Sequence, residues 1–318
     1  MLNSLKAIDL FCGLGGSSRG LAQAGIEVIA GFDLWDVAGS VYMENFPDAW
    51  FYEGKLEDWN VKNVRRQLGK IDLITASPEC TNHSPAKGNK PRCEKSKETA
   101  FQVIRYAKAF NPRWLIIENV VSMRNWKRYK EFIKELGPDG LGYYVTEFII
   151  DASDFGVPQS RRRLFIVCDK EKEPVIKIPK IRKKINANEI ILKNSDYQFS
   201  PLRTETRAGA TLERADRAIS RLGKDGEFLL VYYGSDAAGG WQSLDRPLRT
   251  ITTLDRFAYV RPAGNGHEMR MLQIPELKAA MGMKRHKVKQ GTRRERIKML
   301  GNGVCPPVMK SIVKSLTS

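Results

Sequence analysis

Short apolar runs alternate with amphipathic stretches through the first half of this 318-residue chain. Such alternation indicates an α/β fold, in which a mostly parallel sheet is covered by helices. Phe101, Ile104 and Ala107 have helical spacing between two of the runs. The runs that predict strands span residues 5–11, 26–32, 71–75, 114–117, 143–150 and 164–167.

A glycine-rich turn over residues 12–16 (Cys-Gly-Leu-Gly-Gly) follows the first predicted strand. We expect Ser17 or Ser18 to cap the next helix and Gly25 to end it. Glycines at such a turn let a ligand approach the backbone at a helix N-terminus, and Asp33 at the end of the second strand is placed to bind ribose hydroxyls. The pattern fits NAD as well as S-adenosylmethionine, and it also fits a turn that serves packing alone.

Three polar clusters follow the later strands. Cys80 comes just after the strand at 71–75, Glu118-Asn119 follows the strand at 114–117, and a run at 159–163 (Gln-Ser-Arg-Arg-Arg) precedes the strand at 164–167. The carboxyl ends of parallel strands are where open sheets bind ligands. A lone cysteine is more often a small buried apolar residue, so Cys80 gains weight only from the other two clusters.

Charge and cysteine content narrow the class of protein. The net charge of +17 and a pI near 9.7 favour a polyanionic partner, most commonly nucleic acid, over a basic surface with no such partner. The five cysteines include no CxxC pair, which argues against structural zinc and a secreted disulfide framework. No apolar run is long enough to span a bilayer and no signal peptide is evident, so we expect a soluble cytoplasmic protein with no membrane partner.

The character of the chain changes after Asp169. Residues 170–184 are rich in lysine, and regular periodicity is hard to find as far as Phe228, where apolar and aromatic residues return. A disordered basic insertion is the alternative to a second domain, and the return of apolar residues disfavours it. We predict a large domain over 1–172 plus 288–318 and a smaller one over 173–287.

Taken together, these motifs resemble those of the DNA (cytosine-5-)-methyltransferases, of bacterial and phage type. The resemblance covers nearly the whole chain outside residues 170–245. It rests on the order and spacing of residues 9–16, Cys80, 118–120 (Glu-Asn-Val), 159–163 and 301–303 (Gly-Asn-Gly). It implies a Rossmann-like S-adenosylmethionine-dependent methyltransferase domain with a second, smaller target-recognition domain, S-adenosyl-L-methionine as cofactor, and no metal.

The resemblance also implies roles for particular residues. Cys80 is the expected nucleophile toward C6 of cytosine, and Glu118 the acid that shares a proton near N3. Arg163 is expected to stabilise charge at O2, with Arg161 organising the site. The expected cofactor-binding residues are Phe11, Gly13, Gly15, Gly16, Asp33, Leu34, Leu56 and Asn302.

The implied partner is duplex DNA with its target cytosine flipped out of the stack, bound by a monomer that is paired functionally with a restriction enzyme. The loop at 81–90 is expected to close over the extruded base. Residues 246–253 resemble the family segment that organises target recognition. A tRNA cytosine-5 methyltransferase, a catalytically weak DNA-binding relative and an NAD-dependent oxidoreductase are the alternatives.

Two positions depart from the family pattern. Glu79 stands directly before Cys80, where the family has proline, and we expect its carboxylate to point away because a charge directed inward would raise the thiol pKa. Lys55 stands where the family commonly has an aspartate that accepts a hydrogen bond from the adenine amino group. An ammonium cannot accept that bond, so adenine binding is expected to be rearranged or weak.

Overall fold

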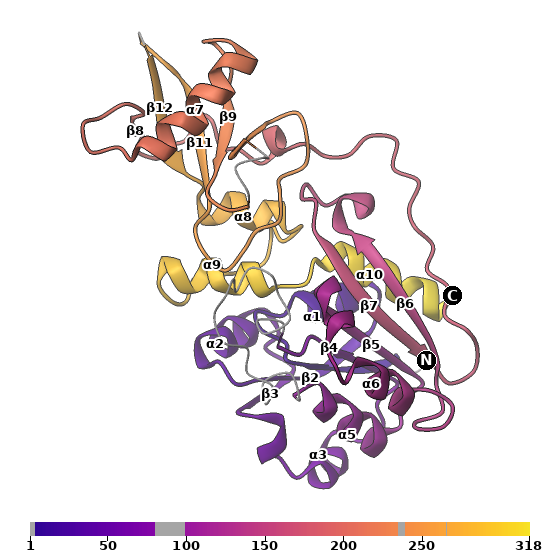
Figure 1. Cartoon of the computed structure of the whole chain (residues 1–318). Coiled ribbons are helices and arrows are strands. Elements are labelled where there is room, and N and C mark those ends of the chain that lie inside the picture. Colours follow the sequence, from indigo (N-terminus) through magenta and orange to yellow (C-terminus); the bar gives the residue numbers. More distant parts are fainter. Residues whose placement is uncertain (1–3, 80–98, 235–238, 265) are drawn as a thin grey trace.

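The computed structural model describes residues 4–79, 99–234, 239–264 and 266–318. A seven-stranded sheet occupies the first half of the chain, in the order β3-β2-β1-β4-β5-β7-β6 (Figure 1). All of its described pairs are parallel except those of β7, which runs antiparallel to both neighbours. The strands are β1 (Lys6–Leu10), β2 (Glu27–Asp33), β3 (Trp50–Glu53), β4 (Leu73–Ala76), β5 (Trp114–Asn119), β6 (Tyr144–Asp151) and β7 (Arg162–Asp169).

Both faces of this sheet are buried, which explains the continuous apolar runs in its strands. Along β5, Leu115 and Ile117 join one core while Trp114 and Ile116 join the other, because successive side chains of a strand point to opposite faces. The first core is covered by α3 (Val61–Leu68), α5 (Ala100–Phe110) and α6 (Tyr129–Leu136). The second is covered by α1 (Gly16–Gln23), α2 (Asp36–Asn45) and α10 (Pro306–Thr317).

The α/β prediction is confirmed, and all six predicted strands are present. The edge strand β3 was not predicted, because four residues are too few to show a period. The predicted serine cap of α1 is wrong: the N-cap is Gly15, and Ser18 lies inside the helix, where Asp9 accepts its backbone N–H at 3.1 Å. Gly25, with φ of 90°, follows the end of α1 as predicted.

A second sheet of five antiparallel strands has the order β10-β9-β11-β12-β8. Together with α7 (Gly209–Leu222) it encloses a separate small core that includes Leu202, Ala215 and Phe228. The sequence did not predict α7, because its buried positions are mostly small residues with a weak apolar signal. The strands are β8 (Ser200–Pro201), β9 (Phe228–Val231), β10 (Trp241–Ser243), β11 (Phe257–Ala263) and β12 (Gly266–Met271).

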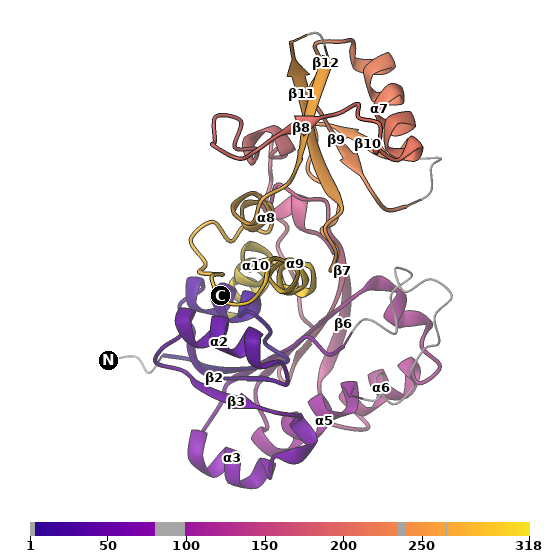
Figure 2. The same ribbon diagram turned by 90° about the vertical axis from the view of Figure 1, so that its left-hand side faces the viewer.

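The chain then returns to the first sheet through α8 (Ile274–Ala280), α9 (Arg293–Asn302) and α10. Figure 2 shows α8 and α9 between the two sheets, with α10 against the larger one. The large unit is therefore built from both ends of the chain. Among the described residues, no helix is both long and apolar enough to cross a membrane.

Candidate active site

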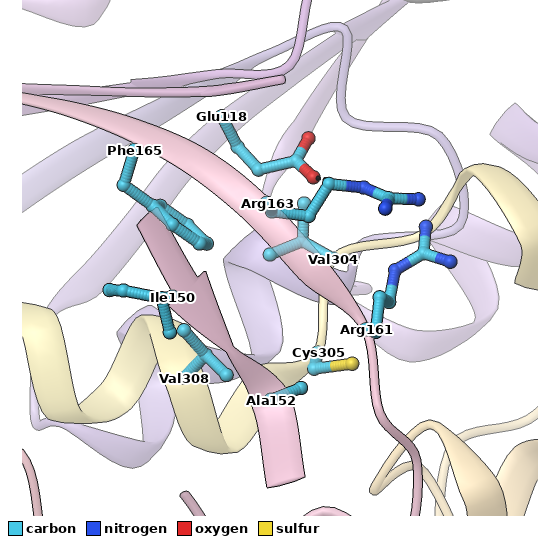
Figure 3. Close-up of a pocket in the computed structure, with 9 residues that line it drawn as sticks. All are labelled: Glu118, Ile150, Ala152, Arg161, Arg163, Phe165, Val304, Cys305 and Val308. Carbon is cyan, nitrogen blue, oxygen red and sulfur yellow. Dashed lines mark ion pairs between the residues drawn. The ribbon is translucent and has the colours of Figure 1, made fainter. Parts of the chain in front are cut away.

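Glu118 and Arg163 form an ion pair at the carboxyl end of β5. Glu118 is 6% exposed, and its Oε1 lies 3.1 Å from Nε of Arg163 on the neighbouring strand β7 (Figure 3). Burial raises the pKa of the Glu118 carboxyl, and the smaller opposing effects come from Arg163 and Arg161. A carboxyl in this setting holds a proton more readily than an exposed one, which suits it to proton transfer.

The next residue along β5 connects this pair to the segment that leads to Cys80. Asn119 donates its side-chain amide to the Pro78 carbonyl at 3.1 Å, two residues before Cys80. Strands β4 and β5 are parallel, so their carboxyl ends share one edge of the sheet. Glu79 is exposed, and the orientation of its carboxylate relative to Cys80 stays a prediction. Cys80 itself and the predicted loop at 81–90 lie outside the described residues.

Arg161 plays a different part from Arg163. Its guanidinium is buried at 3% exposure and donates to the carbonyls of Ile251, Gly301 and Gly303 at 3.0, 2.7 and 3.0 Å. A guanidinium that donates to several carbonyls holds backbone segments in place. Arg161 therefore joins three segments that are distant in the sequence, and its organising role in catalysis stays a prediction.

Gln159, for which the sequence predicted no role of its own, makes a similar connection. Its amide donates to the Ala280 carbonyl at 3.1 Å and accepts from Ile251 N–H at 2.8 Å, and its side chain is fully buried. The residue also pairs with Leu248 in an isolated parallel bridge. The segment at 246–253 is thus attached to the start of β7 by Gln159 and Arg161. The signal that could have found this role is an amide inside a run of charged residues next to a strand.

A small cavity of about 10 Å³, the space of one water molecule, lies beside the Glu118–Arg163 ion pair (Figure 3). Cys305 contributes to its wall, and burial raises the pKa of its thiol to about 11, so this thiol is protonated at neutral pH. A second cysteine near Glu118 is therefore a poor nucleophile. The lining residues are Glu118, Ile150, Ala152, Arg161, Arg163, Phe165, Val304, Cys305 and Val308.

The glycine turn contains residues whose backbone lies in the left-handed region. Gly13 and Gly15 have φ of 51° and 88°, and Phe11 has φ of 57°, which is uncommon for a residue with a side chain. Gly16 is required for a close approach, since a Cβ there would lie 2.2 Å from the Val304 carbonyl oxygen. The C-terminal segment thus packs directly against the turn.

Asp33 holds the turn rather than standing free beside it. Its Oδ2 accepts from Gly13 N–H at 2.8 Å and its Oδ1 from Trp35 N–H at 2.9 Å, while burial raises the pKa of the carboxyl. Each carboxylate oxygen keeps a second lone pair, so further acceptance remains available. Asp9 supports the turn from β1 in the same way, since it accepts from Ser18 N–H and Oγ at 3.1 and 2.7 Å.

The other predicted cofactor residues lie in contrasting environments. Leu34 is 63% exposed directly after Asp33, so it offers an apolar surface. Leu56 is buried, and its carbonyl accepts from the Tyr106 hydroxyl at 3.2 Å. Asn302 is exposed at the end of α9, and Lys55 is exposed before Leu56. Among the described residues, no group of three or more His, Cys, Asp or Glu could hold a metal ion.

Comparison with known proteins places these features in one family. The family model for C-5 cytosine-specific DNA methylase matches residues 5–318. The chain is 32% identical over 163 residues to the Type II methyltransferase M.HgiDI of Herpetosiphon aurantiacus, covering 51% of this chain and 52% of that protein. It is 28% identical over 206 residues to M.HindV of Haemophilus influenzae, covering 63% of this chain and 64% of that protein. Each match spans less than two thirds of the relative.

The same fold occurs in solved structures. A DNMT2 mutant of Spodoptera frugiperda superposes with a TM-score of 0.71 at 17% identity, covering 99% of this chain and 100% of that one. At this identity the likeness concerns the fold. Because the family model spans both the glycine turn and the C-terminal helices, this chain belongs to the C-5 cytosine-specific DNA methylase family.

Proposed function

We propose that this protein transfers the methyl group of S-adenosylmethionine to C5 of a cytosine in duplex DNA, through a covalent bond between Cys80 and C6. The observation that carries the proposal is the buried Glu118–Arg163 pair at the carboxyl end of β5, next to the strand that leads to Cys80. Membership of the C-5 cytosine-specific DNA methylase family supports the reaction class.

The chemistry requires an acid near the attacked ring. C5 of cytosine is a poor nucleophile until the Cys80 thiolate bonds to C6 and raises the electron density at C5. Glu118 then shares a proton with N3, and Arg163 donates to O2, so that the charge pushed into the ring is neutralised. C5 would take the methyl group of S-adenosylmethionine, which would leave as S-adenosylhomocysteine. C5 then loses its proton to solvent, N3 returns its shared proton to Glu118, and the Cys80–C6 bond breaks. The thiolate leaves and 5-methylcytosine is released.

The glycine turn and its surroundings fit the cofactor. Apart from its chain neighbours, no atom of the described residues lies within 4 Å of the position that a Cβ would take at Gly13, which leaves room for a ligand. Leu34 supplies an exposed apolar surface suited to an adenine ring. Phe11, Gly15, Gly16, Asp33, Leu56 and Asn302 complete the proposed site. When bound, S-adenosylmethionine supplies an electrophilic methyl group on a sulfonium. Asp33 holds the turn and keeps lone pairs for hydroxyl groups.

The five-stranded sheet is the proposed target-recognition part. We propose that residues 173–287 form this smaller domain, and that residues 1–172 and 288–318 form the catalytic one. The net charge of +17 supports binding to DNA phosphates. A cytosine cannot be attacked at C6 and methylated at C5 while stacked, so the proposal includes base flipping. The name Type II methyltransferase of M.HgiDI supports a role beside a restriction enzyme, in the cytoplasm.

The covalent step can be tested with 5-fluorocytosine. Fluorine cannot leave C5 as a cation, so wild-type protein treated with S-adenosylmethionine and a duplex that carries 5-fluorocytosine at the target should remain attached in a denaturing gel. Cys80→Ser should not be trapped, since a hydroxyl is far less ionised than a thiol. Cys12, Cys168 and Cys305 are buried, and their serine variants, with that of Cys93, are the matched controls. An adduct that survives in Cys80→Ser contradicts the assignment.

A separate experiment tests whether the substrate is DNA or tRNA. Bisulfite sequencing of random duplex DNA after treatment reports activity and target sequence together, and an equal reaction with tRNA reports the alternative substrate. Methylation of tRNA without methylation of DNA would overturn the proposed substrate. A protein that binds DNA but methylates neither substrate would be the catalytically weak relative.

An exchange of the recognition part tests the domain assignment. Replacing residues 175–245 alone would separate β9 from β11, its hydrogen-bonded neighbour, so the exchange should span 173–287 and carry the whole second sheet. The chimera with a related enzyme should methylate a new sequence with methyl transfer retained. An active chimera with unchanged target choice would sink the assignment.

A further inference from the structure

His286 is a buried histidine in the segment between α8 and α9, which the sequence did not single out. It is 2% exposed, and its Nε2 lies 2.6 Å from the carbonyl oxygen of Leu14, in the middle of the glycine turn. A carbonyl only accepts hydrogen bonds, so Nε2 must carry the proton. Nδ1 is buried with no hydrogen-bond partner among the residues that the structure describes, which suits the neutral ring.

This bond fixes a part of the turn that the acidic residues do not hold. Asp33 accepts the N–H of Gly13 within the turn, and Asp9 accepts the N–H of Ser18 in the first turn of α1. Leu14 contributes a carbonyl, which needs a donor from elsewhere. Because the peptide unit is planar, holding this oxygen also fixes the direction of the N–H of Gly15, which donates to the Cys12 carbonyl at 2.8 Å.

The next residue forms a second attachment, to α2. The Asn45 side chain donates to the Lys287 carbonyl at 2.8 Å and accepts from Lys287 N–H at 2.9 Å. The His286 ring also lies 6.1 Å from the ring of Phe46, centroid to centroid. Residues 286–287, the clasp, therefore form hydrogen bonds to both the glycine turn and the end of α2.

On its other side the clasp continues into α8, which is anchored to the second sheet. Glu276 and Arg270 form a fully buried ion pair with oxygen–nitrogen distances of 2.7 and 2.8 Å, and this pair links α8 to β12. The Gln159 amide donates to Ala280 at the end of the same helix. The segment that reaches the glycine turn is thus attached to β12 and Gln159 through α8, and to the turn and α2 through the clasp.

We propose that His286 is a positioning residue for the methyl donor, which holds the Leu14 peptide in the orientation that cofactor binding requires. This inference rests on the proposed function. It assigns the residue no contact with substrate. Loss of the Nε2–H donor should leave the turn free to rotate its Leu14–Gly15 peptide, so cofactor binding would carry the added entropic cost of ordering it.

Calorimetry with S-adenosylhomocysteine on the full chain is the test. His286→Phe keeps an aromatic ring but has no donor, and its Kd should rise roughly 2- to 12-fold, the equivalent of one net hydrogen bond. His286→Gln keeps an N–H donor and should restore the Kd to within about 2-fold of wild type. His267→Phe in β12 is the matched control, and its Kd should not change.

Kinetics separate positioning from general damage. In His286→Phe the KM for S-adenosylmethionine should rise while kcat at saturating cofactor stays near that of wild type, since the reacting groups are untouched. An unchanged Kd and KM in a folded but less stable His286→Phe would overturn the proposal, because the contact would then be structural alone. A Kd that rises equally in His286→Gln would also overturn it.

Failure of the proposed function can be distinguished from failure of the His286→Phe variant to fold. If wild-type protein neither binds S-adenosylhomocysteine nor methylates DNA, the proposed function fails, irrespective of His286. If His286→Phe does not fold, His286→Leu takes its place, because it also removes the Nε2–H donor and has a smaller side chain. A wild-type Kd in folded His286→Leu would then contradict the proposal.

Discussion

Arg163 Nε lies 3.1 Å from Oε1 of Glu118, across the antiparallel pair of strands β5 and β7. The arginine stabilises the charged form of the carboxyl, while burial stabilises the protonated form and has the larger effect on its pKa. In the proposed reaction both groups act on the same ring, Glu118 as a proton carrier and Arg163 as a fixed positive charge.

Replacing Glu118 by glutamine should reduce methyl transfer by at least about 100-fold, because the amide can accept from Arg163 but cannot exchange a proton with N3. Binding of DNA and S-adenosylhomocysteine should stay within a few-fold of wild type. Single-turnover methylation with tritiated cofactor measures the rate. Glu171→Gln, an exposed change two residues after the end of β7, is the control. A Glu118→Gln rate near that of wild type would remove this residue from the mechanism.

Lys55→Asp should tighten S-adenosylmethionine roughly 2- to 12-fold, since it supplies an acceptor for the adenine amino group. Lys55 is the exposed N-cap of the short 3-10 helix Leu56–Asp58, a position that favours aspartate, so the change should not harm the fold. Calorimetry checks the affinity, with Lys62→Asp as an equal charge change elsewhere. Equal or weaker binding by Lys55→Asp would mean that the lysine has its own role.

Gly16→Ala should destabilise the protein by about 1–3 kcal/mol and weaken cofactor binding, because its Cβ would lie 2.2 Å from the Val304 carbonyl oxygen. Gly209→Ala, at the first residue of α7, is the matched control. Outside its own helix and chain neighbours, no atom in the described part of the chain lies within 4 Å of its Cβ position, so stability there should be unchanged or rise by up to about 1 kcal/mol. Urea unfolding of both variants measures this, and equal stabilities would contradict the close packing at Gly16.

Burial of His286 predicts a pH dependence of stability. The pKa of its ring is lowered from 6.5 to about 4, chiefly by burial, and the cations Arg19 and Lys278 add to this. Between pH 6.5 and about 4, the His286 ring is therefore mostly neutral in the folded state and mostly protonated in the unfolded chain. Stability from this residue is fully present above pH 6.5 and is lost as the pH falls toward 4, by about 2 kcal/mol at pH 5.

The measurement is urea unfolding of wild type and His286→Gln at pH 7 and pH 5. The wild type should lose about 2 kcal/mol more than the variant between these values. Burial also raises the pKa of Asp9 to about 6, which has the opposite effect over this range, but Asp9 is common to both proteins and its contribution cancels. Parallel losses in the two proteins would show that His286 does not titrate as predicted.

The sequence by itself determined the large sheet. Runs such as Trp114–Asn119 are apolar at every position until the polar Glu118, which identifies a strand buried on both faces and its functional end. Glycines at positions 13 and 15 likewise specify a turn that most other residues adopt only with strain. These features are local, so they can be recognised without knowing what surrounds them.

Helix α7 and strand β3 were not predicted, because neither has a strong local sequence signal. In α7 the buried residues Thr211, Ala215 and Ala218 carry little apolar signal, and β3 is short. Both elements owe their stability to the sheet beside them, and propensity alone does not favour them enough to be predicted.

Only the tertiary structure decided the long-range partners. Arg161 donates to carbonyls at Ile251 and Gly301, 90 and 140 residues away, and His286 donates to Leu14 across 272 residues. A buried donor must find an acceptor, but its sequence says only that one is needed and not which one. That choice follows from how the two sheets, α8 and the C-terminal helices pack together, because packing brings one particular carbonyl within reach of each side chain.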